Sequence, residues 1–232
     1  MDRSMAMANR EIAVRGIGKA TVAPDLIVLD MSVTSTETDY GKTMNRAAEL
    51  FEALRSAIVA AGYDNKALKT TNLSINTKYK SIRNNNEYNQ IFIGYSCFHS
   101  TRLEFDIDMQ KLGALLGAIA ECKANPQLTV RFAVKDPDAV SEQLLASAVE
   151  DARRKAEVLA KSAGVALGEV KRIDYNWSEH VYYSNTSLGL GENAAGFAEL
   201  SSVDMDIAPE DIKASDTAAV IWAIEAINAT NE

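Results

Sequence analysis

The chain has 232 residues, which is enough for one large domain or two small ones. Its apolar fraction of 47% and charged fraction of 24% are ordinary for a globular protein and exclude disorder throughout the chain. The formal net charge of -8 argues against a general nucleic-acid binder, which needs a basic face, and gives no pull towards anionic lipid. A local basic patch is still compatible with this balance.

The sequence as given shows no signal-peptide pattern at its N-terminus and no membrane-spanning pattern along its length. Residues 1–10 lack an apolar run of signal-peptide length, and no window approaches the roughly 20 apolar residues of a membrane span. We therefore expect no membrane span and a cytoplasmic chain; a chain from which a leader had been removed would instead be periplasmic or secreted. Residues 1–10 are predicted to be a flexible N-terminus, and 226–232 a C-terminal tail.

The two cysteines, Cys97 and Cys122, have no CxxC spacing, so they predict neither a metal knuckle nor a disulfide framework. One disulfide between them and two buried thiols both fit the sequence, and the thiols are the simpler interpretation.

Residues 11–33 are predicted to form two strands joined by a bend, and the first contains Gly16-Ile17-Gly18. A dinucleotide-binding fingerprint needs G-x-G-x-x-G at the opening of a helix. Here the third glycine is absent and a strand follows. The motif is therefore predicted to be a bend or bulge in a strand rather than a phosphate loop.

Helical periodicity then covers residues 39–61, with Asp39 as the expected N-cap and Gly62 at the left-handed position that ends the helix. The period returns to two over residues 68–80 and 88–107. The asparagine-rich run between these segments is typical of a turn, so a long hairpin is expected.

The second half of the chain repeats this alternation. Asp108 is expected to cap a helix, a strand follows at 127–135, and Pro137 opens a third helix that Gly164 ends. The inner stripe of the third helix is predicted to be Leu145, Ala148, Ala152, Ala156, Leu159 and Ala163. A strand is expected at 167–177.

Two later segments are less regular. Residues 178–205 are rich in Ser, Asn and Gly and are predicted to be a long mobile loop. In residues 212–227 alanine favours a helix, whereas Val220, Trp222 and Ile224 alternate as in a strand. Periodicity alone leaves both open. The strand–helix–strand order, used three times, predicts an α+β fold: an antiparallel or mixed sheet with a long hairpin and three main helices packed on one face.

Several short motifs in order resemble the SIMPL domain family, long catalogued as a domain of unknown function (DUF541). They are Val14-Arg15-Gly16-Ile17-Gly18, Val22-Ala23-Pro24-Asp25, Gly94-Tyr95-Ser96, the Ala-rich helix 146–164, Leu167-Gly168-Glu169-Val170 and Asp206-Ile207-Ala208-Pro209. Glu210 stands where the family usually has a glycine. The resemblance covers about residues 11–225, which are taken as one SIMPL-like domain with sub-lobes 11–107 and 108–225.

The resemblance implies an α+β protein without a known cofactor or established catalytic residues. Some members assemble into large ring-like or channel-like oligomers. Suggested roles include tolerance to oxidative stress and, in an animal relative, association with a signalling kinase. The resemblance also favours a strand at 212–225. Because both faces of this strand carry apolar residues, it is expected inside the sheet or at a subunit contact.

Cys97 and His99, two residues apart, share one face of a strand and are weak catalytic candidates. A nucleophile and base need a third group and an open cleft, and a zinc site needs more ligands. A half-buried thiol and a packed imidazole are therefore the favoured interpretation. A peroxide-reactive Cys97 would require a lowered pKa.

Aromatic residues beside the long loop are candidates for partner binding. Tyr182 and Tyr183, next to His180, would form a recognition patch or simply end a strand, and Trp222 is the third candidate. The carboxylates Glu104, Asp106 and Asp108 alternate on the hairpin, where a solvated face ending in a helix cap explains them better than a cation site.

The leading hypothesis is a non-enzymatic protein that works through homo-oligomer assembly and binding of a protein partner, with no cofactor, metal or nucleic acid. The alternatives are a redox-active protein that uses Cys97 and His99, and a small-ligand binder with a pocket under residues 178–205.

Overall fold

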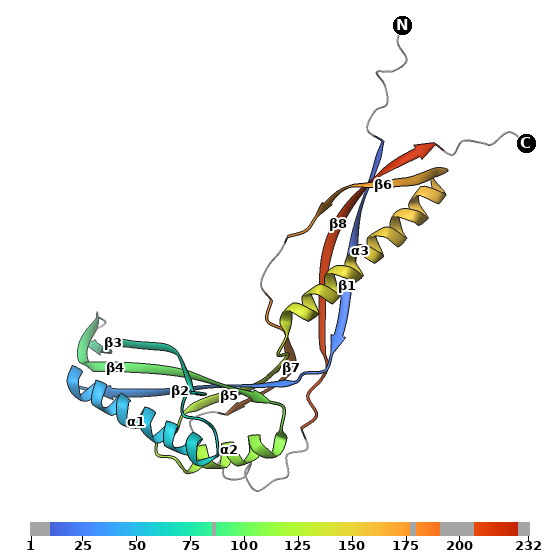
Figure 1. Ribbon diagram of the computed structural model, residues 1–232. Helices are drawn as coiled ribbons and strands as arrows, with labels where there is room; N and C mark the ends of the chain where they lie inside the picture. The colour runs from blue at the N-terminus through green and yellow to red at the C-terminus, as the bar shows by residue number, and fades with distance from the viewer. Residues whose placement is uncertain (1–9, 85–86, 177–179, 191–206, 227–232) are drawn as a thin grey trace, which may run out of the picture. The chain divides into compact units, whose positions relative to one another are not determined.

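The computed structural model describes residues 10–84, 87–176, 180–190 and 207–226 (Figure 1). Their contacts divide the chain into two compact units. Unit 1 takes residues 1–23, 134–183 and 211–232, and unit 2 takes residues 24–133 and 184–210. The boundary expected after residue 107 lies inside unit 2, because the strand at 127–133 pairs with the strand at 26–37. Among the described residues, no helix has the length and apolar character needed to cross a bilayer.

Unit 1 is a three-stranded antiparallel sheet with one helix packed on it. The strand order is β1 (Glu11–Val22), β8 (Ile212–Ala226) and β6 (Val165–Asp174), and α3 (Pro137–Ser162) lies against β1 and β8. The ambiguous C-terminal segment is thus a strand in the middle of a sheet, as the resemblance predicted. Val220 is fully buried and Trp222 is 4% exposed on the side that α3 covers.

The glycines of β1 let α3 approach the strand closely. The pairing of β1 with β8 runs without a register shift from Glu11↔Ala223 to Val22↔Ile212, so the predicted bend or bulge at Gly16 and Gly18 was wrong. A Cβ on Gly16 would lie 1.8 Å from the carbonyl oxygen of Ala148. These positions therefore need glycine because a helix backbone occupies the space of a side chain.

The same close approach decides which face of α3 is buried. The buried residues follow a strict four-residue spacing: Val140, Leu144, Ala148, Ala152, Ala156 and Ala160. The predicted stripe was wrong at Leu159, which is 50% exposed, at Leu145, which is half-buried, and at Ala163, which is exposed just after the end of the helix. The last four positions of this stripe are alanines, because the helix backbone lies against the strand there and leaves no room for a leucine side chain.

Unit 2 is a five-stranded antiparallel sheet with two helices on one face (Figure 1). The strand order is β3 (Lys69–Asn84), β4 (Glu87–Asp106), β2 (Leu26–Glu37), β5 (Gln127–Ala133) and β7 (Tyr183–Leu190); the helices are α1 (Tyr40–Ala60) and α2 (Met109–Glu121). The β3–β4 hairpin is confirmed. The core lies between the sheet and the helices, and its fully buried members include Leu29, Leu103, Leu115 and Phe132.

Side chains define the helix starts as the sequence predicted. Asp39 accepts a hydrogen bond from the Lys42 amide at 3.0 Å, and Asp108 accepts one from Lys111 at 3.0 Å. Asp136 does the same for α3, which has its proline in the first turn. Two of the predicted strand–helix–strand repeats lie within unit 2. The third is divided between the units, since β5 and β6 belong to different sheets.

Part of the predicted loop at 178–205 is a strand. Tyr183–Leu190 forms β7, hydrogen-bonded to β5, so the loop prediction was wrong there; residues 178–179 and 191–205 lie outside the described residues. Two hydroxyl groups of β7 form hydrogen bonds with the backbone of Glu210, which lies just before β8. The Ser184 hydroxyl donates to the Glu210 carbonyl at 2.6 Å, and the Glu210 amide donates to Thr186 Oγ1 at 3.0 Å. The α+β class itself is confirmed, with the helices distributed over two sheets.

Candidate interaction site

Cys97 lies on β4, on the face of the sheet that α1 covers. Its side chain is 1% exposed, and its strand neighbours are Ser35 on β2 and Ile75 on β3. Burial raises the pKa of the Cys97 thiol. The environment therefore favours the neutral thiol, whereas a reactive cysteine needs the thiolate. Cys122, at the end of α2, is a second free thiol, and burial raises its pKa too.

His99 is packed against α1 rather than placed in a cleft. Its ring lies 4.4 Å from the ring of Phe51, and its Nε2 lies 3.0 Å from Thr70 Oγ1. Burial, and secondly the positive charge of Arg55, lower the pKa of His99. Both effects favour the neutral imidazole. Among the described residues no hydrogen bond joins His99 to Cys97, so the structure does not assemble these two weak candidates into a nucleophile and base.

The aromatic candidates are placed differently from what their sequence position suggested. Tyr182 is 9% exposed and packs with Val140 and Leu144 of α3, and its hydroxyl lies 3.0 Å from Ser141 Oγ. Trp222 is buried under the same helix. Both therefore contribute to the core of unit 1. Tyr183 is partly exposed at the start of β7, and His180 stacks loosely on Tyr182 with ring centroids 5.9 Å apart.

The alternating carboxylates do not form a cluster. Asp108 caps α2, and that hydrogen bond from the Lys111 amide lowers its pKa. Glu104 lies 4.0 Å from Arg102 on the other face of the sheet. Within the described part of the chain, no group of three or more His, Cys, Asp or Glu side chains is arranged to hold a metal ion.

An ion-pair network on this other face was not predicted. Asp30 on β2 accepts from Arg102 Nε of β4 at 2.8 Å and also pairs with Arg131 of β5. It links three neighbouring strands and fixes their register. Only knowledge of the strand pairing could have revealed it, because the three residues are far apart in the sequence.

The outer edge of β1 is covered by side chains of α3. Ser147, Asp151 and Lys155 are spaced by four and lie on one stripe of the helix. The Ile17 amide donates to Asp151 Oδ2 at 2.9 Å, and Lys155 Nζ donates to the Arg15 carbonyl at 3.3 Å. These contacts satisfy polar groups that an edge strand otherwise offers to another chain. Unit 1 is therefore protected against strand addition at β1.

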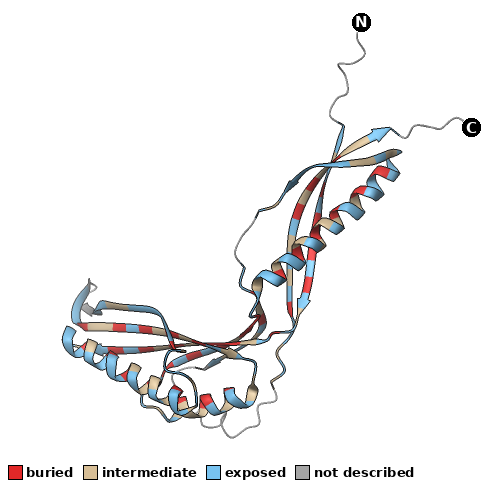
Figure 2. Ribbon diagram, in the orientation of Figure 1, coloured by how far each residue is buried: buried red, intermediate tan, exposed pale blue. Residues whose placement is uncertain are grey.

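The distal part of the β3–β4 hairpin is much less protected. Most residues of β3 are exposed (Figure 2), and β3 is the last strand of its sheet. Four aromatic rings follow one another here from the hairpin to the start of α1. The centroid distances are 5.8 Å from Tyr79 to Phe92, 5.4 Å from Phe92 to Tyr95 and 5.6 Å from Tyr95 to Tyr40. We call these four residues the aromatic strip.

The aromatic strip is exposed although its rings contact one another. The exposed fraction is 51% for Tyr79, 46% for Phe92 and 51% for Tyr40, and Leu73 on the same strand is 53% exposed. A row of large apolar side chains beside an unpaired strand edge is typical of an interaction surface. Sequence reasoning identified the hairpin but not this strip, because the ring contacts depend on the register between β3 and β4.

Comparison with known proteins then places the chain in a family. A family model described as SIMPL, protein of unknown function (DUF541), matches residues 12–222, which is most of the chain. The chain belongs to the SIMPL family. The resemblance drawn from its ordered motifs is thereby confirmed.

Relatives of this chain include the 26 kDa periplasmic immunogenic proteins of Brucella melitensis biotype 1 and Brucella abortus strain S19. Each is 28% identical to this SIMPL protein over 174 residues, which is 74% of this chain and 69% of the relative. Two of the SIMPL landmarks now have a structural meaning: Gly16 and Gly18 admit α3, and Gly94, with φ of 140°, lies where a Cβ would be 2.2 Å from the Glu37 carbonyl oxygen.

Proposed function

We propose that this SIMPL protein is not an enzyme and that it functions by assembling into a homo-oligomer and binding a protein partner. The observation that carries the proposal is the exposed aromatic strip on the β3–β4 hairpin. Tyrosine and phenylalanine bury large apolar areas with few rotatable bonds, which makes them the usual anchors of protein interfaces.

The contrast between the two sheets supports this location. At β1 the edge amides of Ile17 and Lys19 face Asp151 and Ser147 of α3, so a second chain cannot pair there without displacing the helix. β3 is the last strand of its sheet, so no described strand pairs with its outer edge, and Leu73 and Tyr79 beside that edge are half exposed. A second copy could therefore add its own strand at β3 and cover the strip.

The family supports the same function, since oligomeric members are what the resemblance implies. The relatives are named as periplasmic proteins, and we extend that location to this chain. A role in oxidative-stress tolerance would then depend on assembly and not on the buried Cys97 thiol. The buried state of Cys97 and His99 gives the redox alternative no support.

The test is light scattering coupled to size-exclusion chromatography. The wild-type protein is expected to elute as a multimer, and Y79S/F92S as a smaller species. A matched control, V158S/V170S, replaces two apolar residues of unit 1 that are at least as exposed, and it should leave the multimer intact. A wild-type monomer at high concentration, or a Y79S/F92S variant of unchanged size with unchanged circular dichroism, would count against the proposal.

A further inference from the structure

The hairpin has a second face, opposite the aromatic strip, with different chemistry. Tyr79 is paired with Phe92, and the next pair towards the turn is Lys80 with Ile91. Because successive side chains of a strand point to opposite faces, Lys80 and Ile91 lie on the face away from the strip. Lys78, paired with Gly94, shares that face, and the register shift at this point leaves Ile93 as the extra residue of β4 between Phe92 and Gly94, across from Lys78 and Tyr79. We call Lys78, Lys80, Ile91 and Ile93 the outer patch.

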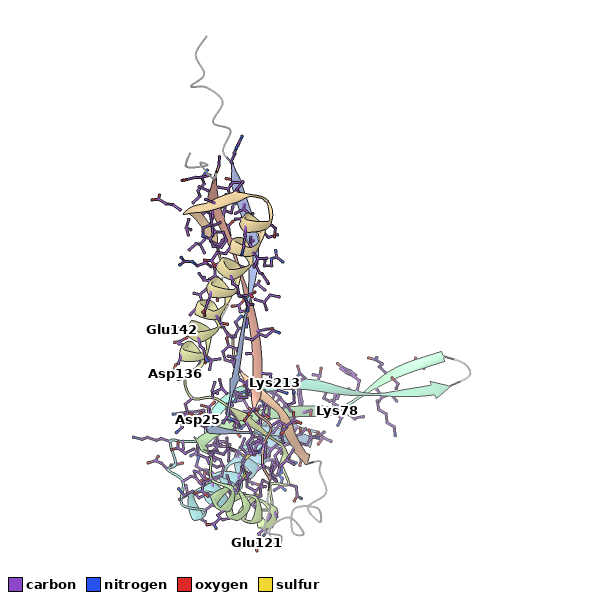
Figure 3. All side chains as sticks on the ribbon, turned by 90° about the vertical axis from the view of Figure 1, so that its right-hand side faces the viewer. Asp25, Lys78, Glu121, Asp136, Glu142 and Lys213 are labelled. Atoms are coloured by element: carbon purple, nitrogen blue, oxygen red, sulfur yellow. The ribbon has the colours of Figure 1, made fainter. Side chains whose placement is uncertain are left out.

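The outer patch is both apolar and positively charged. Ile91 is 50% exposed, Ile93 is 38% exposed, and both lysines are exposed. Neither lysine makes an ion pair with a described residue. Lys78 lies where the hairpin continues beyond the part of the sheet that α1 and α2 cover (Figure 3).

On the side away from the turn, the described neighbours of the outer patch carry no charge that would neutralise it. The next paired positions on the same face are Asn76 with Ser96 and Ser74 with Phe98, none of them charged. Further along, Asp30 pairs with Arg102 and Arg131. A chain with a formal net charge of -8 thus presents a cationic face at the hairpin. This is the local basic patch that the overall composition left open.

The chemistry of the outer patch fits a lipid surface better than a shaped protein partner. Its charges are lysine ammonium groups, which are point charges on flexible stems, rather than the planar guanidinium groups that recognise one carboxylate geometry. Its apolar side chains are aliphatic and lie close to the charges on a two-stranded hairpin. Binding to an anionic membrane surface requires only positive charge at the level of the headgroups and apolar side chains just below it.

We propose that the outer patch binds an anionic lipid surface. Ile91 and Ile93 enter the boundary between headgroups and acyl chains, and Lys78 and Lys80 lie among the headgroups. The contact is peripheral and reversible, since two lysines and two isoleucines amount to a single weak anchor. It uses the face of the hairpin that the assembly proposal does not use, so each proposal can fail without the other.

The experiment is flotation of the full chain with vesicles of phosphatidylcholine alone and of phosphatidylcholine mixed with phosphatidylglycerol. Binding is expected only to the mixed vesicles and should fall as salt rises. K78Q/K80Q should lower the partition coefficient roughly thirtyfold, from about 1 kcal/mol lost per lysine. I91S/I93S should lower it about tenfold or more, because apolar contact is removed while charge is kept.

Matched controls separate the patch from general effects. K161Q/K213Q removes the same charge from unit 1, and V158S/V170S removes exposed apolar groups there; both should bind as the wild type does. Equal binding to both kinds of vesicle, no binding, or K78Q/K80Q that binds like K161Q/K213Q would overturn the proposal. So would I91S/I93S that changes the size of the particle in light scattering with no loss of vesicle binding, since that result would make the patch a contact between copies.

Discussion

The α-carbon of Gly18 faces the backbone of Leu144, so closely that a Cβ on Gly18 would lie 1.9 Å from the Leu144 carbonyl oxygen. The obstacle is backbone, which cannot rotate away as a side chain can. The distance between β1 and α3 is therefore set by the absence of a single methyl group, at Gly18 and again at Gly16.

Replacing Gly18 by alanine should push α3 off the sheet and expose part of the alanine-lined contact. We expect a loss of roughly 3 kcal/mol or more in the free energy of unfolding, at the upper end of overpacking costs. Urea denaturation followed by circular dichroism measures it. Gly113 in α2 is the control, since nothing lies within 4 Å of an added Cβ there and G113A should be neutral or stabilising. A G18A protein as stable as the wild type would contradict the tight contact.

His99 should make stability depend on pH in a defined direction. Burial lowers its pKa below 6.5, so the unfolded chain binds a proton before the folded one does. The contribution of His99 to the free energy of unfolding is complete above pH 6.5 and decreases as the pH falls towards the pKa of His99 in the folded protein. The difference in unfolding free energy between wild type and H99Q should therefore shrink below about pH 6.5. A difference that stays constant from pH 7.5 to 5, measured at roughly half-unit steps, would mean that His99 charges freely in the fold.

Asp151 should act in the same direction as His99, but at a lower pH. Its hydrogen bonds with Lys155, with the Ile17 amide and with Arg154 hold its pKa well below the ordinary 3.8. The contribution of Asp151 to the stability of the fold is present above pH 3.8 and is lost only as the pH falls towards its lowered pKa. D151N is expected to have a lower Tm than the wild type at neutral pH, with the gap persisting down to about pH 4. E150Q, on the exposed neighbouring position, is the control and should change the Tm little.

Cys97 should be inert in the folded protein. In a C122S background only this thiol can react, and its burial at 1% exposure and raised pKa both oppose attack. A disulfide reagent such as Ellman's should label it slowly in buffer and rapidly in urea. Rapid labelling without urea, or consumption of peroxide that disappears in C97S, would revive the redox alternative.

Local signals in the sequence predicted most of the elements correctly. Asp39 and Asp108 cap helices because their carboxylates need only amides three residues ahead, and such contacts can be read from a short window. The helix-ending glycines Gly62 and Gly164 have φ of 92° and 67°, again a local requirement. The alternation of apolar residues likewise located the β3–β4 hairpin.

The errors concern contacts between residues far apart in the chain. Gly16 looked like a bend because the feature that requires a glycine there, the backbone of α3, lies more than half the chain away. The strand at Tyr183–Leu190 was hidden by its Ser, Asn and Thr content, and it is held by Glu210 and by β5. The link between Asp30, Arg102 and Arg131 depends on two strand registers at once.

Strand β1 is synthesised before the other described strands, and its partner β8 is synthesised after them. Unit 2 has its helices and four of its five strands by residue 133, whereas the sheet of unit 1 cannot close until β8 has left the ribosome. A nascent SIMPL chain of this kind must carry an unpaired, glycine-containing strand from the synthesis of β1 to that of β8. Such long-range closure is slow and exposes the strand to misassociation. Truncation by a few residues at the C-terminal end of β8 would therefore be expected to affect folding yield more than final stability.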